Sequence, residues 1–316
     1  MEFTLSPTYP HQPLISALTT FYTLLVDLCY IPASCLSLPL VKTGSHPPRS
    51  INHRAASRHG FSNEVIDLTY RIPYLTDDDY KIHGETNPLC YLVPPGKQIP
   101  GDEDEYNPLE QEEGEEQWEY AKDPTYQERD DLFKNRNALV LTRGNAYGTE
   151  LIYDLDKCTI TAWNHFTQSD YWTDEPSYSM TSVHNPLYVW INHFLTLEYI
   201  PFEGNLIVPL PLEAHGYPGN NPSEEEMEQW REGIKRHEKE RGLKNVYIEC
   251  GWKTDAANSL GINSKDDGKN VANEEQDRRI WEKLEQAREM ARNDFQGNVF
   301  VEKRKKYMKR IYTESS

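Results

Sequence analysis

The sequence lacks the short motifs that identify most enzymes and cofactor-binding proteins. It has no His-Glu-x-x-His zinc motif, no Gly-x-Ser-x-Gly nucleophile elbow and no Cys/His spacing typical of zinc sites, although it contains ten histidines. Its five cysteines are odd in number and include no Cys-x-x-Cys pair, so a reducing compartment is favoured over a disulfide framework. We therefore expect no cofactor, no metal site and no assigned catalytic residue.

Positive charge is also scarce. The 316 residues include 33 Lys and Arg against 51 Asp and Glu, a net charge of −18. This balance argues against nucleic-acid binding by phosphate neutralisation and against docking on an anionic membrane. Residues 101–131 contain 14 acids and two bases, and so account for 12 of the 18 charges. We expect residues 94–136 to form a disordered or solvated acidic insert that favours a basic protein partner.

No clean membrane-length run of apolar residues is present. The most apolar stretch, Leu14 to Ile31, contains Asp27 and three threonines, and no Lys or Arg precedes it. A signal peptide normally has a basic segment before its apolar core, and a membrane span needs about 20 cleaner residues. The stretch therefore predicts a buried amphipathic helix, and we expect a cytoplasmic protein.

The segment "LTRGNAYGTELIYDL" contains two glycines, Gly144 and Gly148, between apolar stretches. A phosphate-binding P-loop would need a Lys-Ser/Thr pair after the second glycine, and a dinucleotide site would need a following helix. The sequence has neither. It predicts a hairpin turn in which Gly144 and Asn145 supply positive φ angles and Gly148 allows a bend or close packing.

Three strands are predicted around this turn: residues 138–143, a second ending at Leu155, and residues 159–163. Short connections make them an antiparallel meander. Further edge-strand residues are expected in "GNLIVPLPL". Helices are expected over residues 14–29, after caps at Asn52 and Ser62, from Pro186 to Pro201, from Ser223 to Gly242, and after Asn273.

The expected fold class is α+β. An antiparallel meander is packed by N-terminal helices and one following helix, and a helical extension ends the chain. We divide the chain into an N-terminal helical part of the core, the acidic insert, the sheet with its closing helix, and a charged helical C-terminal extension. Their ranges are 1–93, 94–136, 137–215 and 216–316.

An aromatic loop follows the third strand. Aromatic rings beside Asn and His can form a binding patch for a protein or a sugar, or can cover the edge of a sheet. Both interpretations stay open. The candidate binding residues are Trp163, His165, Phe166, Tyr171 and Trp172.

Two other functions remain as alternatives. An enzyme of unrecognised class would use Glu150, Asp154 or His165 at the sheet edge, although Asp in a turn more often bonds its own backbone. A nuclear regulatory protein would use the C-terminal basic residues for import, although such a cluster also suits the end of a helix. These basic residues are Lys303, Arg304, Lys305, Lys306, Lys309 and Arg310.

Two stretches resemble the SMI1/KNR4 (SUKH) family. "INHRAASRHGFSNEVIDLTYRI" is similar to the family's opening helix, loop and second helix, and "YGTELIYDLDKCTITAW" is similar to its sheet motif. "NPLYVWINHFL" resembles its closing helix. The matching positions are Gly60, Phe61, Val65, Leu68, Tyr70, Ile72, Gly148, Tyr153, Asp154 and Trp163.

The resemblance covers about residues 51–199, with the acidic insert interrupting it. The family's Leu-Pro pair is replaced by Ser62-Asn63, and its Asn-Gly pair by Pro73-Tyr74. The resemblance implies a non-catalytic protein-binding module, because bacterial members bind toxins as immunity proteins and fungal members act in cell-wall and stress signalling through protein contacts.

Overall fold

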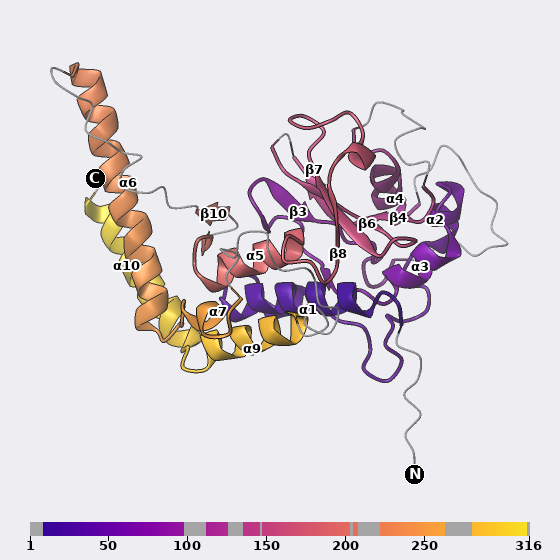
Figure 1. The fold of residues 1–316 in the computed structure, drawn as a ribbon. Helices are drawn as coiled ribbons and strands as arrows, with labels where there is room; N and C mark the ends of the chain where they lie inside the picture. Colours follow the sequence, from indigo (N-terminus) through magenta and orange to yellow (C-terminus); the bar gives the residue numbers. More distant parts are fainter. Residues whose placement is uncertain are drawn as a thin grey trace, which may run out of the picture.

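The structure, a computed structural model, is a mixed α+β fold, as the sequence predicts (Figure 1). A four-stranded antiparallel sheet lies over a layer of helices, and two long helices near the C-terminus run side by side. In the described part, no helix is both long and apolar enough to cross a bilayer. The described residues are 9–97, 112–125, 135–145, 147–202, 205–207, 222–262 and 280–314.

Helix α1 (Gln12–Asp27) confirms the helix predicted from the apolar N-terminal stretch. Pro13 occupies its first turn, where a missing N–H costs nothing. Its leucines and Phe21 are fully buried, because α5 (Pro186–Leu195) and α9 (Ile280–Arg292) both pack against it. The residues assigned to a C-terminal extension therefore supply part of the core through Leu284, Ala287 and Ala291.

Two short helices precede the sheet, and both use the predicted caps. The Asn52 side chain accepts a hydrogen bond from the Ala55 amide before α2 (His53–Arg58). Ser62 accepts one from Val65 before α3 (Asn63–Thr69). Each cap satisfies a backbone donor that the first helical turn leaves unpaired.

The main sheet has the strand order β4–β6–β7–β8, and all neighbours are antiparallel. The single strand predicted over residues 138–143 is divided at Leu141, so that β5 pairs with β3 rather than with the main sheet. Every residue of β6 is buried, because both faces of this strand are covered. The strands are β3 (Thr86–Pro88), β4 (Ala138–Val140), β5 (Thr142–Gly144), β6 (Glu150–Asp154), β7 (Thr159–Trp163) and β8 (Ser177–Ser179).

The remaining short elements connect these parts. Strand β10 confirms the edge strand predicted in "GNLIVPLPL", and it pairs only with β9. The short elements are η1 (Ala33–Cys35), β1 (Leu36–Ser37), β2 (Tyr74–Leu75), η2 (Trp172–Asp174), β9 (Ile200–Phe202), β10 (Asn205–Ile207) and α7 (Ala256–Ser259).

The expectation of a disordered or solvated acidic insert is wrong for residues 112–125. Helix α4 (Glu115–Lys122) forms there, and Trp118 is fully buried with its ring centroid 5.0 Å from that of Phe61. The high average charge of the segment conceals this apolar face. Two of its acids, Glu112 and Glu115, accept hydrogen bonds from Arg58 at 2.9 and 2.7 Å. Residues 98–111 and 126–134 lie outside the described residues.

Helix α6 (Glu224–Glu249) begins with the predicted Ser223 capping box, but the predicted end at Gly242 is wrong. The helix continues through Gly242. This glycine lies against α10 (Gly297–Glu314) and leaves room for it. A Cβ there would lie 2.0 Å from the Tyr307 hydroxyl oxygen, which donates a hydrogen bond to the Lys239 carbonyl. Asn273, the predicted cap before α9, lies outside the described residues.

Candidate functional site

The glycine segment between β5 and β6 is a closely packed turn rather than an anion site. A Cβ on Gly148 would lie 2.5 Å from the Glu85 carbonyl oxygen, so the predicted close packing is confirmed. The prediction of a positive φ at Gly144 and Asn145 is wrong, because neither residue has one and Gly144 is in strand β5. Gly144 instead leaves space for Glu150, whose Oε1 would lie 2.8 Å from an added Cβ.

Glu150 is the first residue of β6 and is fully buried. The Tyr120 hydroxyl donates a hydrogen bond to its Oε1 at 3.2 Å, and His165 Nδ1 lies 3.4 Å from the same oxygen. Burial raises the pKa of Glu150 to about 8 and lowers the pKa of His165. Both shifts disfavour an ion pair between these two side chains.

The aromatic loop divides into core residues and surface residues. Trp163 is fully buried and donates its Nε1–H to the Ser169 carbonyl at 2.9 Å, and Trp172 in η2 is also buried. Tyr171 is partly buried. Phe166 is 64% exposed, and its ring centroid lies 4.1 Å from that of His165. The His165 ring thus lies between the rings of Trp163 and Phe166. Of these three side chains, only that of Phe166 is well exposed.

Asp154 does not join this group. It lies at the far end of β6 from Glu150, about 13 Å away at the usual rise of a strand. Its Oδ1 accepts the Lys157 amide at 3.2 Å, and its Oδ2 lies 3.1 Å from the Lys157 ammonium. The turn accounts for both interactions. Of the three residues in the enzyme alternative, the structure brings together only Glu150 and His165.

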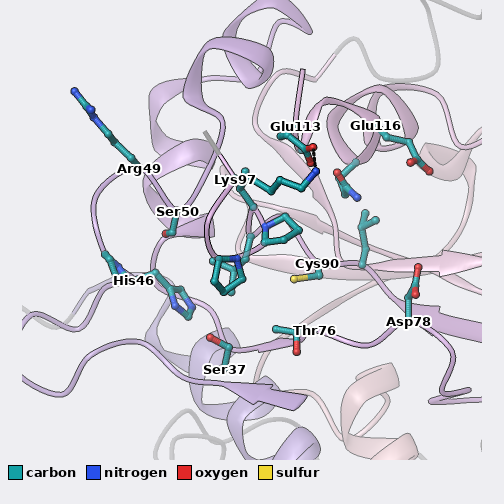
Figure 2. A pocket seen from close by; sticks show the side chains of 18 of the residues that line it. Ser37, His46, Arg49, Ser50, Thr76, Asp78, Cys90, Lys97, Glu113 and Glu116 are labelled. Carbon is teal, nitrogen blue, oxygen red and sulfur yellow. Dashed lines mark hydrogen bonds and ion pairs between the residues drawn. The ribbon is translucent and has the colours of Figure 1, made fainter. Parts of the chain in front are cut away.

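A surface groove of about 920 Å³ lies beside the N-terminal half of α4 (Figure 2). Most of its lining comes from the loop before α2, from residues 88–97 and from residues 112–117, and the rest from Ser37, Thr76, Asp78 and Arg143. Figure 2 shows His46 and Ser50 at one end of the groove, and Asp78 and Glu116 at the other. Five prolines contribute to the lining: Pro47, Pro48, Pro88, Pro94 and Pro95.

Ion pairs hold the rim of the groove. Lys97 reaches Glu113 at 2.6 Å, an interaction visible in Figure 2. Arg143 lies 3.2 Å from Glu116 and places its guanidinium 4.6 Å from the centre of the Tyr120 ring. Because Tyr120 also bonds Glu150, Arg143 connects the groove to the buried carboxyl group.

Burial shifts the pKa values of two groups that line the groove, Cys90 and His46. Burial raises the pKa of the Cys90 thiol to about 11, so the thiol stays protonated and is a poor nucleophile. His46 Nε2 lies 2.9 Å from the Ile72 carbonyl oxygen, and burial lowers the pKa of this histidine.

The one carboxylate cluster found among the described residues is Asp77, Asp78 and Asp79, whose ligand oxygens lie within 4.8 Å of one another. Asp77 Oδ1 accepts the Asp79 amide at 3.1 Å, which is the geometry of an ordinary Asx turn. Oxygen ligands of this kind suit Ca²⁺ or Mg²⁺. The turn, however, accounts for the arrangement without an ion.

The groove residues Lys97, Glu116 and Arg143 were not among the residues predicted to bind. The proline pairs at 47–48 and 94–95 are the available sequence signal, but in sequence they indicate only turns. Comparison of the chain with family models, curated proteins and solved structures gave no match. The resemblance to the SUKH family therefore remains a prediction from short motifs.

Proposed function

We propose that the chain is a non-catalytic protein-interaction module whose groove accepts an extended segment of a basic partner protein. The observation that carries this proposal is an open groove of about 920 Å³ whose described lining includes five prolines and a protonated cysteine, Cys90. Proline fixes its own φ angle, so the walls lose little conformational freedom when a partner binds. Protein binding is also the role that the SUKH resemblance implies.

Charge favours a basic partner. The acids of the groove already pair with bases of the same chain, as Glu113 does with Lys97 and Glu116 with Arg143. The rim pair is exposed, so a Lys or Arg of the partner can replace Lys97 at little cost. The chain's net charge of −18 would also speed the encounter with a positively charged protein.

Catalysis by the Glu150 and His165 pair is the weaker alternative. A reacting group must come within hydrogen-bonding distance of the acid or base that serves it. Glu150 has no exposed surface, and His165 covers one side of it. The Tyr120 hydroxyl and Gly144 also lie against its Oε1.

The test selects peptides from a random library displayed on phage, with the immobilised full-length chain as the target. We expect selected peptides to be rich in Lys or Arg. Their affinity, measured by calorimetry, should fall about tenfold in Lys97→Trp, because the indole occupies the rim of the groove where the peptide would lie.

Lys305→Trp is the matched control, since Lys305 also forms an exposed ion pair, with Glu302 at 3.0 Å on α10. The proposal fails if no peptide is enriched, or if both variants weaken the selected peptides equally. Thermal unfolding of each variant checks that the fold is retained.

Nuclear import through α10 is a second proposal, carried by the exposure of Lys305 and Lys306. Deleting the helix would also remove Met308 and Tyr307 from their packing, so point substitutions are the better test. Lys305→Gln with Lys306→Gln should abolish nuclear accumulation of a fluorescent fusion, whereas Lys235→Gln on α6 should not. Unchanged accumulation in the double variant would exclude this route.

A further inference from the structure

A second pocket, of about 470 Å³, lies where the C-terminal end of α5 meets α6. It is separate from the groove and shares no residue with it. Its lining combines basic and aromatic side chains with one acid. The lining residues are His193, Leu197, Glu198, Tyr199, His237, Arg241 and Lys244.

Three hydrogen bonds fix the walls of this pocket relative to each other. Lys244 Nζ donates to the Thr196 carbonyl at 3.1 Å, and Trp252 Nε1 donates to the Leu195 carbonyl at the same distance. The Tyr247 hydroxyl donates to the Pro201 carbonyl at 3.3 Å. These bonds join the end of α5, the turn after it and strand β9 to α6 and to the segment that follows α6.

The turn after α5 has an unusual backbone. Leu197 follows the helix with a φ of 52° and is fully buried. Glycine usually occupies such a left-handed position, since a side chain there is strained. The turn directs the chain so that Glu198 and Tyr199 both line the pocket. Strain of this kind is typical of functional sites.

The pocket is more basic than the rest of the chain. His237, Arg241 and Lys244 project from one side of α6 at helical spacing. Within the described ranges, no acid pairs with Arg241. The one acid in the lining, Glu198, lies 3.6 Å from His193 Nε2 and is 61% exposed.

Two further groups of the lining, His193 and Lys244, have Glu198 as their nearby acid. His193 Nδ1 is buried and has no hydrogen-bond partner among the described residues. Burial lowers the pKa of Lys244 and of His193, which means that each group would gain from a nearby negative charge. Beside them, the rings of His193 and Tyr199 form an aromatic wall with their centroids 4.8 Å apart.

We propose that this pocket binds a small phosphate monoester, with the phosphate between Arg241, Lys244 and His193. The guanidinium supplies a planar pair of donors, and the ammonium supplies a point charge, a combination that suits a tetrahedral dianion. The volume exceeds that of a phosphate alone, so the organic part of the ligand lies against Tyr199.

Calorimetry on the full-length chain at constant chloride concentration tests the proposal with three probes: inorganic phosphate, ribose 5-phosphate and malonate. Ribose 5-phosphate should bind more tightly than the other two. Arg241→Gln should weaken its binding at least about tenfold, since it removes two charge-assisted hydrogen bonds. Arg236→Gln, an exposed position of α6 outside the pocket, should leave binding unchanged.

Arg241→Lys distinguishes recognition from folding, because it keeps the charge but loses the paired donors, and it should bind with an intermediate affinity. Absence of binding by ribose 5-phosphate, equal weakening in Arg236→Gln, or an unchanged affinity in Arg241→Gln would overturn the phosphate site. Equal or tighter binding of inorganic phosphate or malonate would overturn the assignment to a monoester.

Discussion

Asp27 and Glu150 are both buried carboxyl groups in the core, yet their surroundings differ. Asp27, at the end of α1, faces the guanidiniums of Arg288 and Arg292 on α9. Glu150, at the start of β6, faces a phenol and a neutral imidazole. Burial raises the pKa of both carboxyl groups, but only at Asp27 do nearby cations oppose the increase.

The two sites therefore meet the cost of burial in different ways. Asp27 is part of an ionic network in which Arg288 also binds Glu285, and Glu285 accepts a hydrogen bond from Thr20 of α1 at 3.0 Å. Glu150 binds a proton and stays uncharged at neutral pH. Removing a charged partner of Asp27 should thus lower the free energy of unfolding most. A change of pH should instead alter the contribution of Glu150.

The largest effect is expected from Arg288→Met. The substitution leaves Asp27 and Glu285 without their shared cation, and breaking a buried pair from one side costs about 3–5 kcal/mol. Urea unfolding should show this loss in the free energy of unfolding. Arg292→Met is the control, because Arg292 is 58% exposed and should contribute less than about 1 kcal/mol. Similar decreases in the free energy of unfolding for Arg288→Met and Arg292→Met would contradict the expected difference between the buried and the exposed arginine.

A smaller effect, dependent on pH, is expected from Glu150→Gln. The pKa of Glu150 is about 8 in the folded chain against 4.5 as its ordinary value, so its favourable contribution is complete below pH 4.5 and is lost as the pH rises through about 8. The free energy of unfolding of the wild type, minus that of Glu150→Gln, should therefore decrease by roughly 3 kcal/mol between pH 5 and pH 8.

Glu302→Gln, at an exposed position of α10, is the control for this series. Its free energy of unfolding should stay within about 0.5 kcal/mol of the wild-type value between pH 5 and pH 8. A Glu150→Gln difference that stays level, or that increases with pH, would show that Glu150 is charged in the folded chain.

The smallest effect is expected from Gly144→Ala, which places a methyl group 2.8 Å from Glu150 Oε1 and 3.0 Å from the Gly148 carbonyl carbon. Overpacking of this kind costs about 1–3 kcal/mol, and the lower end is expected because a carboxyl group can rotate. A double-mutant cycle with Glu150→Ala measures the coupling by urea unfolding. Additive effects would mean that the backbone of Gly148, and not Glu150, sets the cost.

Local signals in the sequence predicted the elements well. Asn52, Ser62 and Ser223 cap the helices that follow them, and the leucine spacing of α1 identifies its buried face. These signals work because a cap or an apolar stripe acts within a few residues of chain. Gly242 shows the limit, since its role depends on Tyr307, 65 positions later in the chain and on another helix.

The candidate site was harder to predict, for the same reason. Trp163 and Phe166 are similar in type and close in sequence, but only the fold decides that one is fully buried and the other exposed. The groove is assembled from six separate stretches of chain, and Arg143 lines it while pairing with Glu116, 27 positions earlier. Nothing in the sequence of any one stretch indicates that the six meet.

The contact between α1 and α9 has a consequence for synthesis on the ribosome. Asp27 and Arg288 are 261 positions apart, so at 5–20 residues per second the partner of Asp27 is made roughly 13 to 50 seconds after Asp27 itself. During that interval the face of α1 that α9 covers remains exposed. Chains released before residue 280 would keep it exposed permanently, and would be recognised by chaperones and proteases as unfinished.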